Sequence, residues 1–185
     1  MDLSQWDKVS YVVRHPDSKQ QARDCFGASK TVRYTQDAPE NPLKEVRVAH
    51  DRKNLYFLIT GFRDFTAPAK GESNWLNLYI GAGEPQDKGW ESYEYLIGAI
   101  CDGTSASIET LSPDFDRKHA GNAGMALHKD RIILRIPRSM IGLKAAGSFH
   151  FKVTTGVENP SDIMDTYKSG SAMPMGRLSF LYRIS

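Results

Sequence analysis

The sequence of 185 residues has only two cysteines, no long apolar run and no marked excess of either charge. Two thiols are too few for a zinc site built from cysteines, and a membrane-spanning helix needs about 18 apolar residues in a row. The 24 basic and 22 acidic residues leave a formal charge of +2. Nucleic-acid-binding modules usually gather a basic excess on one face. We therefore expect neither a membrane span nor nucleic-acid binding.

The spacing of apolar residues that marks amphipathic helices is also scarce, whereas alternation with a period of two recurs along the chain. Residues 55–60 are apolar on both faces, which is typical of a central strand. The alternating and apolar runs predict strands at 9–14, 31–34, 45–49, 55–60, 74–80, 93–98, 106–111, 125–128, 131–137, 149–154 and 178–184.

Turn residues separate these runs. Lys129-Asp130 joins two alternating runs and predicts a tight hairpin, and residues 137–141 predict one helical turn. Residues 114–124 and 160–175 are the stretches where we expect least regular structure. Ten to twelve short strands with little helix predict an all-β protein, a two-sheet antiparallel β-sandwich of the immunoglobulin-like or jelly-roll kind. With no repeat or linker, residues 1–185 form one expected domain.

The sequence has no dedicated catalytic motif. It lacks a G-x-S-x-G elbow, a Walker loop and a Rossmann fingerprint, and its five histidines show no metal-binding spacing. No acidic pair stands at a recognisable spacing for glycoside hydrolysis, so we expect no catalysis. Cys25 and Cys101 either form one disulfide or remain two buried thiols.

Three aromatic residues are the candidates for contacts outside the core. Sugar rings stack on indole and phenol rings, which offer a large contact area with few rotors to freeze. Trp75 falls on the strand face opposite Leu76 and Leu78, so we expect it to point outward. Trp90 lies at a loop edge and Tyr167 in a late loop. The alternative is that the tryptophans close the open ends of the core.

Several stretches resemble the family 9 carbohydrate-binding modules. They include VRVAHDRKNLYFLITGFRDF, NWLNLYIG and GWESYEYLIG between residues 46 and 98. Nearly the whole chain takes part in the likeness. The matching positions are Trp6, Asp51, Asn54, Leu55, Tyr56, Asp64, Trp75, Ile136, Pro137, Ile141, Gly142, Gly170, Pro174, Gly176 and Arg177.

The resemblance implies a β-sandwich that holds a sugar chain end between two aromatic side chains, often with structural calcium. Trp75 and Tyr167 match the positions of this clamp, with a tyrosine in place of the second tryptophan. Further expected sugar contacts are Arg63, Asp64, Glu72, Asn74 and Trp90.

The expected calcium ligands are the oxygens of Asp51, Asp64 and Asp102, since loop carboxylates suit a hard cation. The alternative is that these aspartates bind no metal and are solvated turn residues. No cofactor is required by this interpretation.

The leading hypothesis is a non-catalytic carbohydrate-binding module for a polysaccharide or oligosaccharide. The alternative is an accessory β-sandwich that packs against a catalytic domain of the same polypeptide and no longer binds sugar. The resemblance further implies a secreted, periplasmic or cell-surface protein. The segment MDLSQWDKVS has neither the basic nor the apolar part of a signal peptide, so we expect an excised or processed domain.

Overall fold

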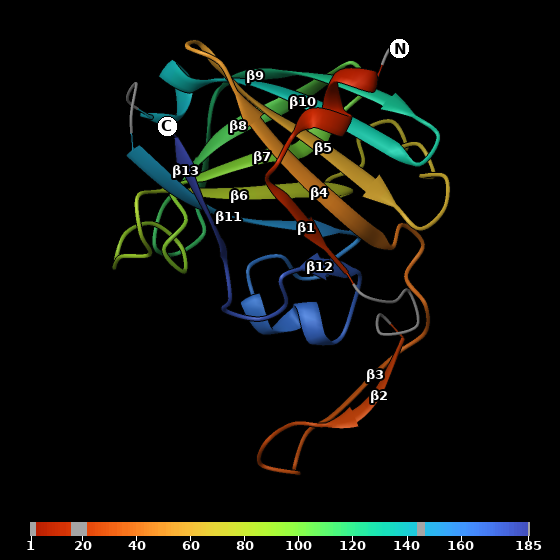
Figure 1. The fold of residues 1–185 in the computed structure, drawn as a ribbon. Coiled ribbons are helices and arrows are strands. Elements are labelled where there is room, and N and C mark those ends of the chain that lie inside the picture. The colour runs from red at the N-terminus through yellow and green to blue at the C-terminus, as the bar shows by residue number, and fades with distance from the viewer. Residues whose placement is uncertain (1–2, 16–21, 144–146, 185) are drawn as a thin grey trace.

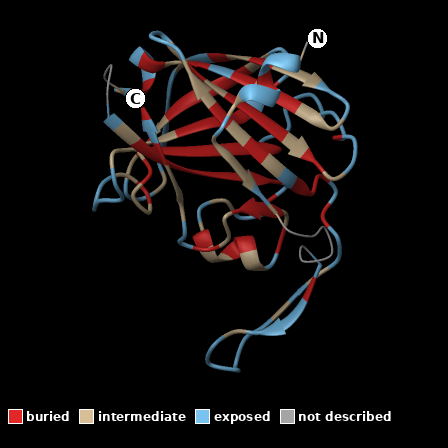
Figure 2. Cartoon of the chain, in the orientation of Figure 1, coloured by how far each residue is buried: buried red, intermediate tan, exposed pale blue. Residues whose placement is uncertain are grey.

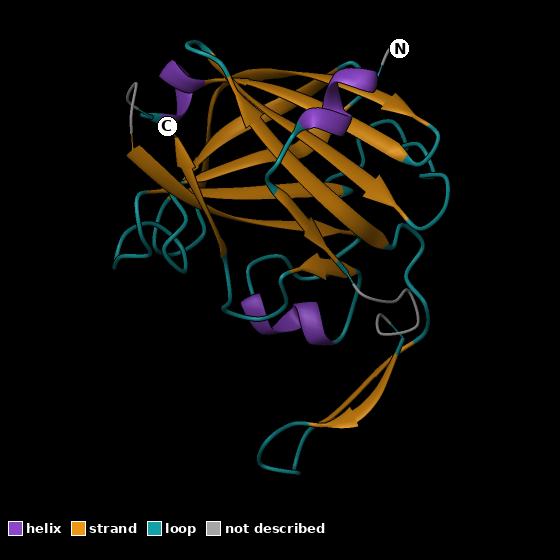
Figure 3. Cartoon of the chain, in the orientation of Figure 1, coloured by secondary structure: helices purple, strands orange, loops and turns teal. Residues whose placement is uncertain are grey.

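The computed structural model describes residues 3–15, 22–143 and 147–184 (Figure 1). Within them lie thirteen strands and three short 3₁₀ helices, coloured by type in Figure 3. The helices are η1 (Ser4–Lys8), η3 (Arg138–Ile141) and η4 (Ile163–Tyr167). The strands are β1 (Val12–Arg14), β2 (Arg23–Phe26), β3 (Arg33–Gln36), β4 (Leu43–His50), β5 (Asn54–Gly61), β6 (Leu76–Ala82), β7 (Tyr95–Cys101), β8 (Ser105–Leu111), β9 (Arg117–His128), β10 (Arg131–Pro137), β11 (Gly147–Thr155), β12 (Ser171–Met173) and β13 (Phe180–Ile184).

Eleven of these strands form one curled antiparallel sheet. Its order is β1-β4-β5-β10-β9-β8-β7-β6-β11-β12, and β13 pairs with β11. The curl brings the β4–β5–β10 part of the sheet over the β6–β11 part (Figure 1). The rings of Phe57 on β5 and Phe151 on β11 lie 5.3 Å apart across this interior. The prediction of an all-β antiparallel sandwich is confirmed.

The main core lies between these two parts of the sheet, and the period of two explains its composition. On β10, Ile132, Leu134 and Ile136 have no exposed surface and face inward, while Arg135 is exposed. The predicted span 131–137 is the span of this strand. β5 lies between β4 and β10 and is buried over most of its length, as its run of apolar residues predicts.

A second apolar cluster covers the opposite face of β6 and β7. The loop that leads into β7 and the segment around η4 fold over this face, so most of β6 is buried on both sides (Figure 2). The buried members of this cluster are Tyr79, Trp90, Tyr93, Leu96, Ala99, Leu111 and Ile163.

β2 and β3 form a separate two-stranded hairpin that projects from the sandwich (Figure 1). Its base is attached by the Gln36 side-chain amide, which donates to the Gly170 carbonyl at 2.7 Å. The rest of the hairpin is mostly exposed, and Phe26 has 61% of its surface accessible.

Two other local predictions are confirmed, and one is wrong. Lys129-Asp130 joins β9 to β10, with Lys129 at a φ of 53°, and η3 supplies the helical turn after Pro137. The first eight of the twelve residues of β9 lie in residues 117–124, where we expected little regular structure. This part contains no large apolar residue, and Ala123 is its one member buried in the main core, so apolar alternation gives no signal. The backbone ladder to β8 holds it as a strand.

The second stretch with little expected regularity contains η4 and β12. Among the described residues, no helix is long and apolar enough to span a membrane.

Candidate functional site

Trp75 precedes β6 and is almost fully buried, with 3% of its surface exposed. Its indole N–H donates to the carbonyl of Thr66 at 2.8 Å, and its ring lies 6.0 Å from that of Phe65. The segment after β5 folds back over the tryptophan. The expectation of an outward-pointing ring is therefore wrong. Trp75 precedes β6, so the alternation of the strand does not extend to it, and its ring belongs to the main core with Phe65 and Leu76.

Trp90 is also buried, with 6% of its surface exposed. Its ring lies 5.4 Å from that of Tyr79 and 4.8 Å from that of Phe115. The adjacent Glu91 forms an ion pair with Arg177 at 3.0 Å. Trp90 thus closes the second apolar cluster and offers no open face to a ligand.

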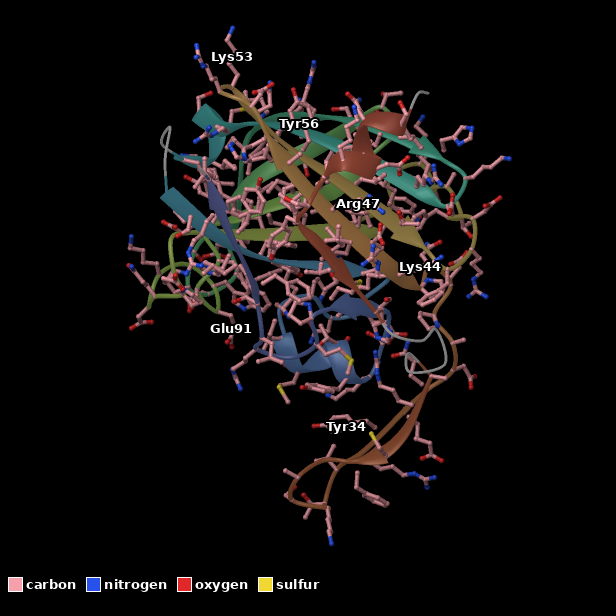
Figure 4. The ribbon with its side chains drawn as sticks, in the orientation of Figure 1. Tyr34, Lys44, Arg47, Lys53, Tyr56 and Glu91 are labelled. Atoms are coloured by element: carbon pink, nitrogen blue, oxygen red, sulfur yellow. The ribbon has the colours of Figure 1, made fainter. Side chains whose placement is uncertain are left out.

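Tyr167 ends η4 and is half-buried. Its ring packs 5.5 Å from that of Tyr34, which the projecting hairpin supplies (Figure 4). The Gly176 backbone lies so close to the Tyr167 ring that a side chain at that position would collide with it. Tyr167 therefore fastens the hairpin to the sandwich, and its ring is engaged with Tyr34.

The predicted polar contacts have separate roles. Arg63 donates to the carbonyl groups of Pro39 and Glu40. Asn74 accepts a hydrogen bond from Arg117 at 3.3 Å. The remaining two, Asp64 and Glu72, are exposed, and a Glu72 oxygen accepts from the Ala69 N–H at 2.7 Å.

A polar groove of about 370 Å³ does lie at Trp75, and we call it the Trp75 groove. Four parts of the chain line it beside the tryptophan: the end of β3 with the segment after it, the segment that carries Glu72, the end of β11 with the turn after it, and the end of the η4 segment. Its lining residues are Gln36, Asp37, Pro39, Glu40, Asn41, Glu72, Trp75, Thr155, Gly156, Glu158, Lys168, Ser169 and Gly170.

The walls of the groove are held by hydrogen bonds across these segments. The buried Asn41 accepts from the Thr66 N–H at 2.9 Å through its side chain, and its carbonyl accepts from the Thr155 hydroxyl at 2.6 Å. Arg63 fixes Pro39 and Glu40 from outside the lining. These bonds pre-organise the groove, which lowers the cost of ordering it around a ligand.

Charge in the Trp75 groove is mainly negative. Four carboxylates line it, against the single ammonium group of Lys168. Carboxylate and amide oxygens accept hydrogen bonds from hydroxyl groups, and the negative charge repels an anionic ligand. The arrangement offers acceptors for a ligand with hydroxyl groups and disfavours an anionic one.

Of the site residues predicted from the sequence, Trp75 and Glu72 line the groove. Tyr167 does not line it, but the next residue in the chain, Lys168, does. Sequence reasoning missed Asn41, Glu158 and Lys168, because they belong to loops far apart in the chain and none stands in a recognisable motif. Arg63 was predicted to contact the sugar directly. It does not line the groove, and its hydrogen bonds instead hold Pro39 and Glu40, which do.

The three proposed calcium ligands do not form a cluster. Both oxygens of Asp51 accept hydrogen bonds within its own turn, from the N–H groups of Lys53 and Asn54 and from the Tyr56 hydroxyl at 2.8 Å. These bonds, that of Tyr56 foremost, lower the pKa of Asp51 to about 2.

Asp102 likewise accepts from the Thr104 and Ser105 N–H groups, which lowers its pKa. No group of three or more His, Cys, Asp or Glu side chains in the described ranges is arranged to hold a metal. Asp51 and Asp102 therefore act as turn caps, and calcium binding by these aspartates stays a prediction.

Both cysteines are free thiols. Cys25 is exposed on the hairpin, whereas Cys101 is buried at the end of β7. Burial raises the pKa of Cys101 to about 11, so its thiol is protonated and poorly reactive at neutral pH.

Comparison of the chain with protein-family models, with curated proteins and with solved structures gave no match. The fold class is that of an all-β antiparallel sandwich, a fold that by itself does not define a function.

Proposed function

We propose that the chain is a non-catalytic carbohydrate-binding domain that holds a neutral sugar unit in the Trp75 groove. The carrying observation is that carboxylates, an amide and the edge of an indole converge on one groove of about 370 Å³. Small-molecule sites commonly enclose about 300–1,000 Å³, with a few placed polar groups that fix orientation.

Recognition in this proposal rests on hydroxyl contacts, since neither Trp75 nor Trp90 exposes a ring for stacking. The side chains of Glu72 and Glu158 and the amide of Asn41 are the expected partners of sugar hydroxyls, and Trp75 forms an apolar part of the wall. Because most of the charge is negative, neutral glycans are expected to bind and uronate-rich or sulfated ones to be rejected.

The test is calorimetric titration with oligosaccharides of glucose, xylose, mannose and N-acetylglucosamine, and with a polygalacturonate as the anionic comparison. Binding of a neutral oligosaccharide at millimolar concentration or better is expected. Glu158→Ala is expected to weaken it about tenfold, because a hydrogen bond to a charged group contributes about 1.5–3 kcal/mol.

Asp87→Ala is the matched control, because Asp87 is exposed and does not line the groove. Failure of every neutral oligosaccharide to bind would refute the proposal.

The second candidate is an accessory domain that packs against a catalytic domain of the same polypeptide. The burial of Trp75 and Trp90 favours it, as does the projecting hairpin with its exposed Phe26 and Val32. In the polypeptide that carries this domain, Phe26→Ser and Val32→Ser are then expected to lower the melting temperature of the catalytic domain. An unchanged melting temperature would contradict this role.

A further inference from the structure

A second pocket, larger than the Trp75 groove, is lined in part by Lys70 and Gly71, which directly precede Glu72 in the chain. It encloses about 500 Å³ and opens on the outer face of β7, β8 and β9. We call it the bulge pocket. Its lining residues are Pro68, Ala69, Lys70, Gly71, Ile100, Cys101, Asp102, Ser105, Ser107, His119 and Asn122.

The first reason for this pocket is an irregularity between β7 and β8. Ile97 pairs with Ile108 and Cys101 with Ala106, so β7 has two residues more than β8 over this stretch. Gly98 makes the detour possible, since its φ is +92° and an added Cβ would lie 3.1 Å from the Leu76 carbonyl oxygen.

The detour of β7 interrupts the ladder beside Ser107. The hydroxyl of Ser107 accepts the Ile100 N–H at 3.1 Å and thereby satisfies a backbone group that the ladder leaves open. Ile100 itself is 55% exposed, although the residues on either side of it in β7, Ala99 and Cys101, are buried. The pocket therefore has a polar floor at Ser107 and an apolar side chain at its edge.

The second reason is a bulge between β8 and β9. Ile108 pairs with Gly121 and Glu109 with His119, so Ala120 is the extra residue on β9. Such a bulge shifts the side chains that follow it to the other face. As a result, His119 lies opposite Glu109, and Asn122 lies opposite Ser107. The side chains of His119 and Asn122 therefore share one face of β9.

The buried carboxylate next to this face has incomplete hydrogen bonding. Glu109 is 6% exposed, and its Oε2 has an ion-pair contact with Arg117 at 3.4 Å but no hydrogen bond. The Ser107 and Glu109 side chains share one face of β8, because they are two residues apart and Ile108 between them belongs to the main core. The outer face of β8 thus combines a hydroxyl and a carboxylate with His119 and Asn122 of β9.

The lining of the bulge pocket indicates its ligand. Lys70 and Asp102 balance in charge, so neither an anion nor a cation is favoured. Ser107, His119 and Asn122 supply donors and acceptors, and the exposed Ile100 supplies an apolar surface. A ring with hydroxyl groups on its edge and an apolar face has the complementary chemistry.

We propose that the bulge pocket is a binding site for a neutral pyranose, separate from the Trp75 groove. Ile100 contacts the apolar face of the ring, while Ser107, His119 and Asn122 hold its hydroxyl groups. Lys70 and Gly71 line this pocket and Glu72 lines the groove, so one short segment separates the two sites.

The test is a titration of the ¹⁵N-labelled chain with glucose, galactose, mannose, xylose and N-acetylglucosamine, followed by amide chemical shifts. One of these sugars is expected to shift the amides of residues 100–107 and 119–122. The double variant His119→Ala/Asn122→Ala is expected to weaken this binding about tenfold, through the loss of two hydrogen bonds.

Both substituted residues are exposed, so the double variant is expected to fold. His128→Ala/Asn159→Ala is the matched control, because these residues are also exposed and line neither site. Glu158→Ala, which tests the groove, is expected to leave the shifts at residues 100–107 unchanged, so the two sites can fail independently. The proposal is overturned if none of the five sugars shifts these amides, or if the double variant binds as the wild type does.

Discussion

Lys152 on β11 has no exposed surface, which is unusual for a lysine, since its charged group is normally hydrated. Its ammonium group donates to the Pro174 carbonyl, and Tyr79 of β6 lies opposite it in the strand register. Burial lowers the pKa of Lys152 to about 7. The charged form is costly in this position because it loses its hydration. His150, also buried on β11, engages the carbonyl groups of Gly83 and Ser92.

The lowered pKa predicts a pH dependence of stability. Above pH 7 the folded chain loses the Lys152 proton, whereas the unfolded chain keeps it until its ordinary pKa of 10.5. The unfolded state then binds more protons, so the contribution of Lys152 to the free energy of unfolding rises with pH, by up to about 1.4 kcal/mol per pH unit. Urea unfolding at about pH 7 and about pH 9 measures it.

Lys152→Met is expected to remove most of this slope, and Lys168→Met, at an exposed site, is expected to retain it. An equal slope in both variants would contradict the assignment. The measurement stays below pH 10, because burial raises the pKa of Tyr79 and Tyr93 and their ionisation in the unfolded chain lowers stability at higher pH.

The tryptophans give a second prediction at this scale. Trp6, Trp75 and Trp90 are 6%, 3% and 6% exposed, so iodide is expected to quench the native fluorescence weakly and the unfolded fluorescence strongly. Trp75→Phe isolates the signal of the other two. A native quenching constant close to that of the unfolded chain would show that a tryptophan is open to solvent.

At the scale of elements, the hairpin and the sandwich differ in what holds them. β2 and β3 pair only with each other, whereas β5 lies between two strands and faces the main core. An isolated two-stranded ribbon is marginally stable, so the hairpin depends on its base contacts at Gln36 and Tyr34.

A pair of phenylalanines measures this difference. Phe26→Ala on the hairpin is expected to change the free energy of unfolding by less than about 0.5 kcal/mol, because most of the ring is already exposed. Phe57→Ala on β5, with no exposed surface, is expected to cost about 3–5 kcal/mol. Denaturant unfolding checks both, and similar losses would mean that the hairpin is packed in solution.

At the scale of the whole molecule, two of the expected calcium ligands also serve as turn caps. Asp51 and Asp102 each close one strand connection through their own backbone neighbours. Treatment with EDTA is therefore expected to leave the melting temperature unchanged within error, and Asp102→Asn is expected to show the same insensitivity. A fall in melting temperature that added calcium reverses would restore the calcium hypothesis.

Much of the fold could be predicted from the sequence, and much less of the candidate site. Residues 131–137 were predicted as a strand because one face is apolar and the other carries arginines. The second apolar cluster could not be predicted in this way, because Tyr79 and Trp90 reach it from different segments.

The sequence by itself determined the all-β class, most strands of the sandwich and the tight turn at Lys129-Asp130. These are local properties, since the period of two and the turn chemistry act over a few neighbouring residues. Only the tertiary structure decided that Trp75 is covered, that the Trp75 groove gathers carboxylates from distant loops, and that two bulges open a pocket beside Ser107. Burial and convergence depend on contacts between segments far apart in the chain, and no local pattern records them.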